Sequence, residues 1–221
     1  MQKAGTFFSS TIGQKVVMGV TGIALFGFVL AHMVGNLQLF MGPETLNAYG
    51  EALREFGHGM GLWVARGGLL TAVVLHIWAA TSLTLGSLKA RPVGYRATRH
   101  RESTYASRTM RWSGPILFIF VGYHLLHFTV GTVHGSFIPG DIYHNVVAGF
   151  QVWPVAAFYM VAMLALGFHL WHGVWSMLQS LGLSHPRWNA FRSAFATIFT
   201  TVVIGGNLSF PIAVLAGWVR E

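Results

Sequence analysis

The sequence contains no cysteine and few charged residues. The absence of cysteine excludes disulfides, iron–sulfur clusters held by thiolates, and covalent haem attachment through a C-x-x-C-H motif. Charged residues make up only 9% of the 221 residues, whereas soluble proteins contain about 25%. Hydrophobic residues make up 53%, and the mean hydropathy is +0.55. A water-soluble core of this size could not bury so much apolar surface, so we expect lipid to be the solvent.

Five apolar segments reach the roughly 20 residues that a helix needs to cross a bilayer. They show no strand-like alternation, and a helix satisfies its own backbone hydrogen bonds in lipid. Four tryptophans near the segment ends, Trp63, Trp112, Trp153 and Trp218, are typical of interfacial anchors. We therefore predict an all-α membrane protein, a single domain over residues 1–221 with five transmembrane helices in a bundle. The predicted helices are Val16–Phe40, Leu62–Leu88, Trp112–Val133, Val152–Leu181 and Ala194–Val219.

The basic residues predict the orientation of the bundle. The net charge is +8, which by itself could indicate nucleic-acid binding, but the charges gather in the predicted loops, above all in Lys89–Arg111. All but Arg54, Arg66 and Arg220 of the 14 lysines and arginines lie at the N-terminus or in the second and fourth loops. Cytoplasmic loops carry such an excess. We expect the N-terminus in the cytoplasm, the C-terminus outside, and no nucleic-acid partner.

Histidine, in contrast, is abundant, with 11 residues, and six of them lie in the first four predicted helices. These six are His32, His76, His124, His127, His169 and His172. One such histidine would be explained best by packing and a hydrogen bond to a carbonyl. Histidines in four successive helices favour function instead, because buried polar groups are expensive in lipid. A haem b held by two histidines needs only two neutral imidazoles from two helices, so four helices suit two haems.

Other ligands fit the pattern less well. Zinc would require a compact tetrahedral set of ligands, and a proton or cation pathway would require acidic residues, which the predicted helices lack in their interiors.

The depth of each histidine along its helix predicts which histidines form a pair. His76 and His169 each lie about 12 residues, or about 18 Å, from the cytoplasmic end. His32 lies about 24 Å along its helix, which by depth alone favours His127 over His124 as its partner.

The histidines and their surroundings resemble a known family. The stretches "FVLAHMVGN", "VVLHIWA", "RWSGPILFIFVGYHLLHF" and "FHLWHGVWSMLQSLGLSHPR" are similar to the di-haem cytochrome b membrane anchor of succinate dehydrogenase and fumarate reductase, complex II, in its single-chain, five-helix form. The resemblance covers nearly the whole chain. It implies haem iron ligands at His32, His76, His124 and His169, with the pairs His32–His124 and His76–His169. The spacing from Gly114 selects His124, and the spacing to Gly182 selects His169.

The resemblance also implies cofactors and partners. The cofactors are two haems b and a quinone, which we expect to be menaquinone. The partners are the iron–sulfur subunit and the flavoprotein subunit of complex II, and the flavoprotein would oxidise succinate. The location would be the bacterial cytoplasmic membrane, with a higher oligomer of the complex possible in principle. His127 and His172 would support the ligands. The loop Lys89–Arg111 is either a docking surface for the iron–sulfur subunit or only a topology signal.

Two questions and two alternatives stay open at this point. The direction of the reaction is one question, and the quinone site is the other. A cytoplasmic quinone site would use Ser10, Thr11, Arg108, Arg111 or His185, and an outer one Glu51, Glu55 or His58. The alternatives for the whole chain are a cytochrome b anchor of another membrane dehydrogenase and a haem-free transporter or proton channel.

Overall fold

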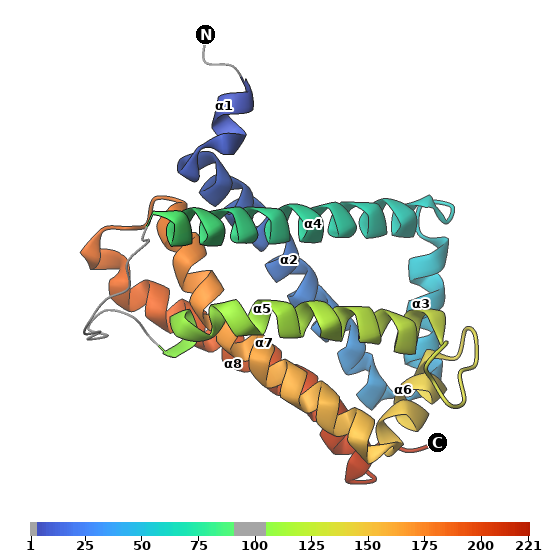
Figure 1. Ribbon diagram of the computed structural model, residues 1–221. Coiled ribbons are helices and arrows are strands. Elements are labelled where there is room, and N and C mark those ends of the chain that lie inside the picture. The colour runs from blue at the N-terminus through green and yellow to red at the C-terminus, as the bar shows by residue number, and fades with distance from the viewer. Residues whose placement is uncertain (1–3, 91–104) are drawn as a thin grey trace.

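The computed structural model describes residues 4–90 and 105–221, and this part of the chain is helical with no strand. Five helices are long and apolar enough to cross a membrane, which confirms the predicted fold class (Figure 1). They are α2 (Thr11–Asn36), α4 (Met60–Lys89), α5 (Tyr105–His124), α7 (Trp153–Ser180) and α8 (Asn189–Leu215). A 3-10 segment, η1 (Leu37–Met41), continues α2, and a π-helical segment, η2 (Leu125–Val130), continues α5.

Helices α2, α5 and α8 begin at least five residues earlier than the apolar pattern predicts, with α5 beginning at Tyr105 instead of Trp112. Helix α2 begins at Thr11 instead of Val16, because the Ser10 side chain caps it by accepting a hydrogen bond from the Gly13 N–H. Helix α8 begins at Asn189 instead of Ala194, directly after a 3-10 turn, η3 (Pro186–Trp188). Hydropathy locates the part of a helix that lies in hydrocarbon, whereas capping determines where the helix starts.

The early start of α8 places Arg192 inside the helix. This side chain is only 2% exposed, and its guanidinium lies 4.3 Å from the centre of the Trp175 ring on α7. It also donates a hydrogen bond to the Asn189 side chain. The apolar pattern places Arg192 in a loop, and the structure corrects this assignment. An arginine near a helix end can pack its stem and stack its head on an aromatic ring.

In the part of the chain that the structure describes, three shorter helices lie outside the five long ones: α1 (Ala4–Ser9), α3 (Pro43–Glu55) and α6 (Ile142–Gln151). The apolar pattern predicts loops for the stretches that hold α3 and α6. Figure 1 shows these two helices at the end of the bundle that carries the C-terminus. Asp141 caps α6 by accepting from the His144 N–H, and it also accepts from Asn47 on α3. These two hydrogen bonds hold the pKa of Asp141 below its usual value, because they favour the carboxylate, and the bond from the His144 N–H has the larger effect.

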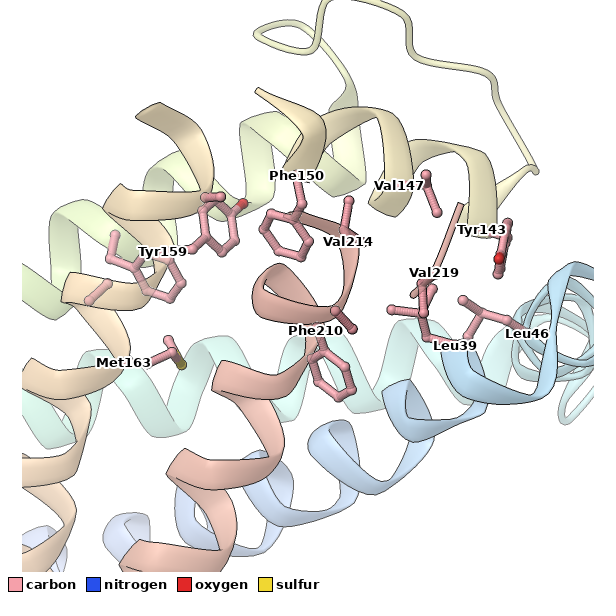
Figure 2. Close-up of a cluster of buried hydrophobic side chains, with 14 residues drawn as sticks. Leu39, Leu46, Tyr143, Val147, Phe150, Tyr159, Met163, Phe210, Val214 and Val219 are labelled. Atoms are coloured by element: carbon pink, nitrogen blue, oxygen red, sulfur yellow. The ribbon is translucent and has the colours of Figure 1, made fainter. Parts of the chain in front are cut away.

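A buried apolar cluster joins the elements at this end of the bundle (Figure 2). It combines Leu39 of η1, Leu46 of α3, Val147 of α6, Tyr159 of α7 and Phe210 of α8. Leu46 and Val147 are 2% and 0% exposed, so the short helices are packed on the bundle and not loosely attached. This cluster fixes the end of α5 and the start of α7.

The long helices pack in a specific set of pairs. Helix α2 packs on α4, α5 packs on α7, and α7 packs on α8. Many of their other apolar side chains are exposed, as expected for surfaces in lipid. Of the predicted anchors, Trp63, Trp153 and Trp218 lie at or near helix ends with 70–79% of their surface exposed. Trp112 is 74% exposed but lies inside α5, because that helix begins at Tyr105.

Candidate functional site

His76 and His169 face each other from α4 and α7. Their ring centroids are 6.4 Å apart. The two helices are not among the closely packed pairs of the described chain, so the imidazoles span a space between them. The chain therefore brings together two histidines that are far apart in the sequence but were predicted at matching depth.

His32 and His124 form a second facing pair, from α2 and the end of α5. Their ring centroids are 5.8 Å apart and the ring planes are nearly perpendicular, at 88°. Helices α2 and α5 are also absent from the closely packed pairs in the described chain. Phe120, Phe128 and Tyr159 surround His124 with ring centroids 5.8–5.9 Å from its own. His124 is therefore packed among aromatic side chains, whereas His32 is exposed on the surface of the chain.

The separation of the rings suits one metal ion between each pair. Two imidazoles bound on opposite sides of a metal, each through a bond of about 2 Å, have ring centres roughly 6 Å apart. A Cβ atom at Gly173, one turn from His169, would meet nothing within 4 Å, so no neighbouring helix packs on α7 at that position. The described residues contain no group of three or more histidine, cysteine or acidic side chains that could hold a metal ion. Each of the two sites therefore offers two facing imidazoles and no larger set of ligands among the described residues.

Hydroxyl groups contact both histidines of the first pair. The Oγ1 atom of Thr21 on α2 lies 3.1 Å from His76 Nδ1, and the Oγ atom of Ser113 on α5 lies 3.2 Å from His169 Nδ1. In both cases the contact is to Nδ1, so Nε2 is the nitrogen left to face the partner histidine. A ligand imidazole is commonly oriented by such a contact to its second nitrogen.

The comparison with known families agrees with this architecture. Residues 87–205, more than half of the chain, match the family model described as the succinate dehydrogenase/fumarate reductase transmembrane subunit. The chain belongs to this family. Comparison with curated proteins and with solved structures gave no significant match. The chain is therefore a multi-pass membrane subunit of the succinate dehydrogenase/fumarate reductase class.

The matched region of this transmembrane subunit includes two of the four histidines that form the facing pairs. His124 and His169 lie within residues 87–205, whereas His32 and His76 precede them. His124 faces His32 and His169 faces His76, so each pair joins one histidine inside the matched region to one outside it. The structure thus joins the unmatched N-terminal part of the chain to the family region through both pairs.

His127 is placed differently from His124. It is 2% exposed, its Nδ1 lies 3.1 Å from the Tyr159 hydroxyl, and its ring stacks on His134 at 4.7 Å. It faces α7 and the segment before α6, and not His32. The three-residue spacing predicts that His127 shares the face of His124. The π-helical segment η2 begins directly after His124, and its wider turn redirects the side chains that follow.

His172 lies one turn from His169 on α7 and is half-buried. Within the described chain its ring has no hydrogen bond or ring contact, so the structure assigns it no partner on a neighbouring helix. The structure therefore brings together four of the six membrane histidines as two facing pairs and leaves His127 and His172 outside them.

Three further residues near the pairs were missed by sequence reasoning: Thr21, Ser113 and Tyr159. Thr21 looks no different in sequence from Thr71 or Thr84, which also lie in apolar helices. Only Ser113 could have been noticed in the sequence, because it directly precedes Gly114, the residue from which the family resemblance locates His124.

Of the candidate quinone-site residues, Ser10 caps α2 and His185 caps η3. Most of the basic loop Lys89–Arg111 lies outside the described residues.

Proposed function

We propose that the chain is the membrane-anchoring cytochrome b subunit of a succinate:quinone oxidoreductase and carries two haems b. His76 and His169 would ligate one haem iron, and His32 and His124 the other. The observation that carries the proposal is the pair of facing imidazole contacts, 6.4 Å and 5.8 Å between ring centroids, each across helices that are otherwise not closely packed.

A bound haem b supplies reversible one-electron chemistry. The protein residues supply the rest. The imidazoles hold the iron, the apolar helices exclude water from the pairs, and Thr21 and Ser113 hold two of the rings. With the two pairs at different depths, electrons would cross the subunit between its cytoplasmic and outer sides.

The partners follow from the family and from the composition. Members of this class work with an iron–sulfur subunit and a flavoprotein subunit, and this chain has no cysteine to hold iron–sulfur clusters. We propose that succinate is oxidised in the flavoprotein and that quinone, with menaquinone as the expected species, reacts at this subunit. The proposed location is the bacterial cytoplasmic membrane with the N-terminus inside.

The two alternatives have less support. A cytochrome b anchor of another dehydrogenase is disfavoured by the family match. A transporter or proton channel would have acidic residues or broken helices near mid-membrane. The interiors of α2, α4, α7 and α8 hold no acidic residue.

The test is the haem content of the purified complex and of its single variants. We expect about two haems b per chain by the pyridine haemochrome assay. His76→Ala or His169→Ala should remove one haem, and His32→Ala or His124→Ala should remove the other. His172→Ala is the matched control on α7 and should keep both. A complex that reduces quinone with no haem, or a His172→Ala variant that loses a haem while His169→Ala keeps both, would contradict the proposal.

A further inference from the structure

We propose that Thr21 and Ser113 are positioning residues that hold His76 and His169 in a single tautomer and ring orientation. The inference rests on the proposed haem ligation by these histidines. Its basis is the pair of contacts from the two hydroxyl oxygens to the imidazole Nδ1 atoms, at 3.1 Å and 3.2 Å.

The hydrogen bonds of Thr21 determine the direction of its contact with His76. The hydroxyl donates its only hydrogen to the backbone of its own helix, 2.7 Å from the Val17 carbonyl and 3.2 Å from that of Met18. Only its lone pairs remain for His76, so Nδ1 carries the hydrogen and donates it to Thr21. Nε2 is then unprotonated, which is the form that binds a metal.

Ser113 makes a similar arrangement for His169. Its hydroxyl donates to the Met110 carbonyl of its own helix at 3.4 Å, and its oxygen lies 3.2 Å from His169 Nδ1. The intrahelical bond is longer than that of Thr21, so it fixes the direction of the contact with His169 less firmly. The expected tautomer is the same, with the hydrogen on Nδ1 and the lone pair on Nε2.

Each hydroxyl comes from the helix that packs beside the histidine helix, α2 beside α4 and α5 beside α7. Thr21 is 7% exposed and Ser113 is 4% exposed, so water does not compete for these hydrogen bonds. A buried hydrogen bond of this kind fixes ring orientation and raises the electron-donating strength of the ligand nitrogen.

The second pair lacks such holders. His124 Nδ1 is buried without a hydrogen-bond partner, and the His32 contact runs from Nε2 to Asn36 on the same helix, at 3.2 Å. The two pairs therefore differ in the support of their ligands. A change at Thr21 or Ser113 should affect one haem and leave the other unchanged.

The experiment compares redox titrations and low-temperature EPR spectra of the intact complex with Thr21→Val and Ser113→Ala. Each substitution removes the hydroxyl oxygen that accepts the hydrogen on Nδ1. The imidazole then donates less electron density to the iron, which favours the ferrous state. We expect the midpoint potential of one haem to rise and its ferric g values to change, with the second haem unchanged. Thr21→Ser keeps the hydroxyl and should restore the wild-type potential and g values.

Thr84→Val is the matched control. Thr84 lies on α4, and its hydroxyl makes the same kind of intrahelical bond, 2.8 Å to the Ala80 carbonyl, without a histidine contact. Two haems with wild-type potentials in both Thr21→Val and Ser113→Ala would overturn the inference and leave the proposed function standing. The inference is equally overturned if Thr84→Val shifts a potential by the same amount, or if Thr21→Ser behaves like Thr21→Val. A wild-type complex without haem would overturn both proposals.

Discussion

At the scale of residues, His124 and His127 show how neighbouring side chains of one type can have different surroundings. His124 faces His32 on α2, whereas His127 contacts Tyr159 on α7 and stacks on His134. Depth along the helix favours His127 as the partner of His32. The family resemblance favours His124, and the structure brings His124 and His32 together. The roles of the two histidines as ligand and supporting residue stay predictions.

These surroundings predict opposite effects of two substitutions. His124→Ala should lower the haem content of the complex from two to one per chain. His127→Ala should keep both haems but destabilise the protein by about 1–3 kcal/mol, because it leaves the buried Tyr159 hydroxyl without its partner. Haem assay and thermal unfolding in detergent measure the two effects. A His127→Ala variant that loses one haem, beside a His124→Ala variant that keeps two, would restore the depth-based pairing.

At the scale of elements, α6 packs tightly against η2, the segment that directly follows His124. Gly149 of α6 lies against His127 and Phe128 of η2, and a Cβ atom there would come within 2.9 Å of both rings. The rings belong to a packed aromatic group that includes His134 and Phe150, so they have little freedom to move away. The absence of a side chain at this position lets α6 close over the end of α5.

Gly149→Ala should therefore destabilise the protein by about 1–3 kcal/mol, the usual cost of overpacking a tight core. Gly122→Ala is the matched control, since a Cβ atom at Gly122 on α5 would meet nothing within 4 Å. Thermal unfolding of the two variants in the same detergent provides the measurement. Equal melting temperatures for both would show that the α6–η2 contact is looser than the structure indicates.

At the scale of the whole molecule, five helices that are long and apolar enough to cross a membrane predict that the start of α2 and the end of α8 lie on opposite sides. The C-terminus lies at the end that carries α3 and α6, as Figure 1 shows. The distribution of lysine and arginine predicts that this end is outside. The pair His76–His169 would then lie nearer the cytoplasm, where the iron–sulfur subunit is expected.

Reporter fusions test this orientation. A phosphatase that is active only outside the cytoplasm should work when fused after Glu221 and fail when fused before Met1. A fluorescent protein that folds only in the cytoplasm should show the reverse pattern. Phosphatase activity from the N-terminal fusion alone would mean that the bundle has the opposite orientation and that the proposed docking side is wrong.

The sequence by itself determined the class of the protein and its five membrane helices. The five helices follow from the length of the apolar segments. The class follows from these segments together with the absence of cysteine and the presence of histidine on four of the helices. The sequence also predicted that His76 and His169 lie at matching depth, because depth needs only the rise per residue. Helices α3 and α6 escaped this reasoning, since they are short and derive their stability from packing on the bundle.

Only the tertiary structure decided which side chains meet. The choice between His124 and His127 depends on the π-helical segment after His124, and the contacts of Thr21 and Ser113 depend on how α2 lies on α4 and α5 on α7. Helix rotation and crossing bring together residues that are 55 and 56 positions apart. No local pattern encodes such a contact, because it results from the packing of whole helices.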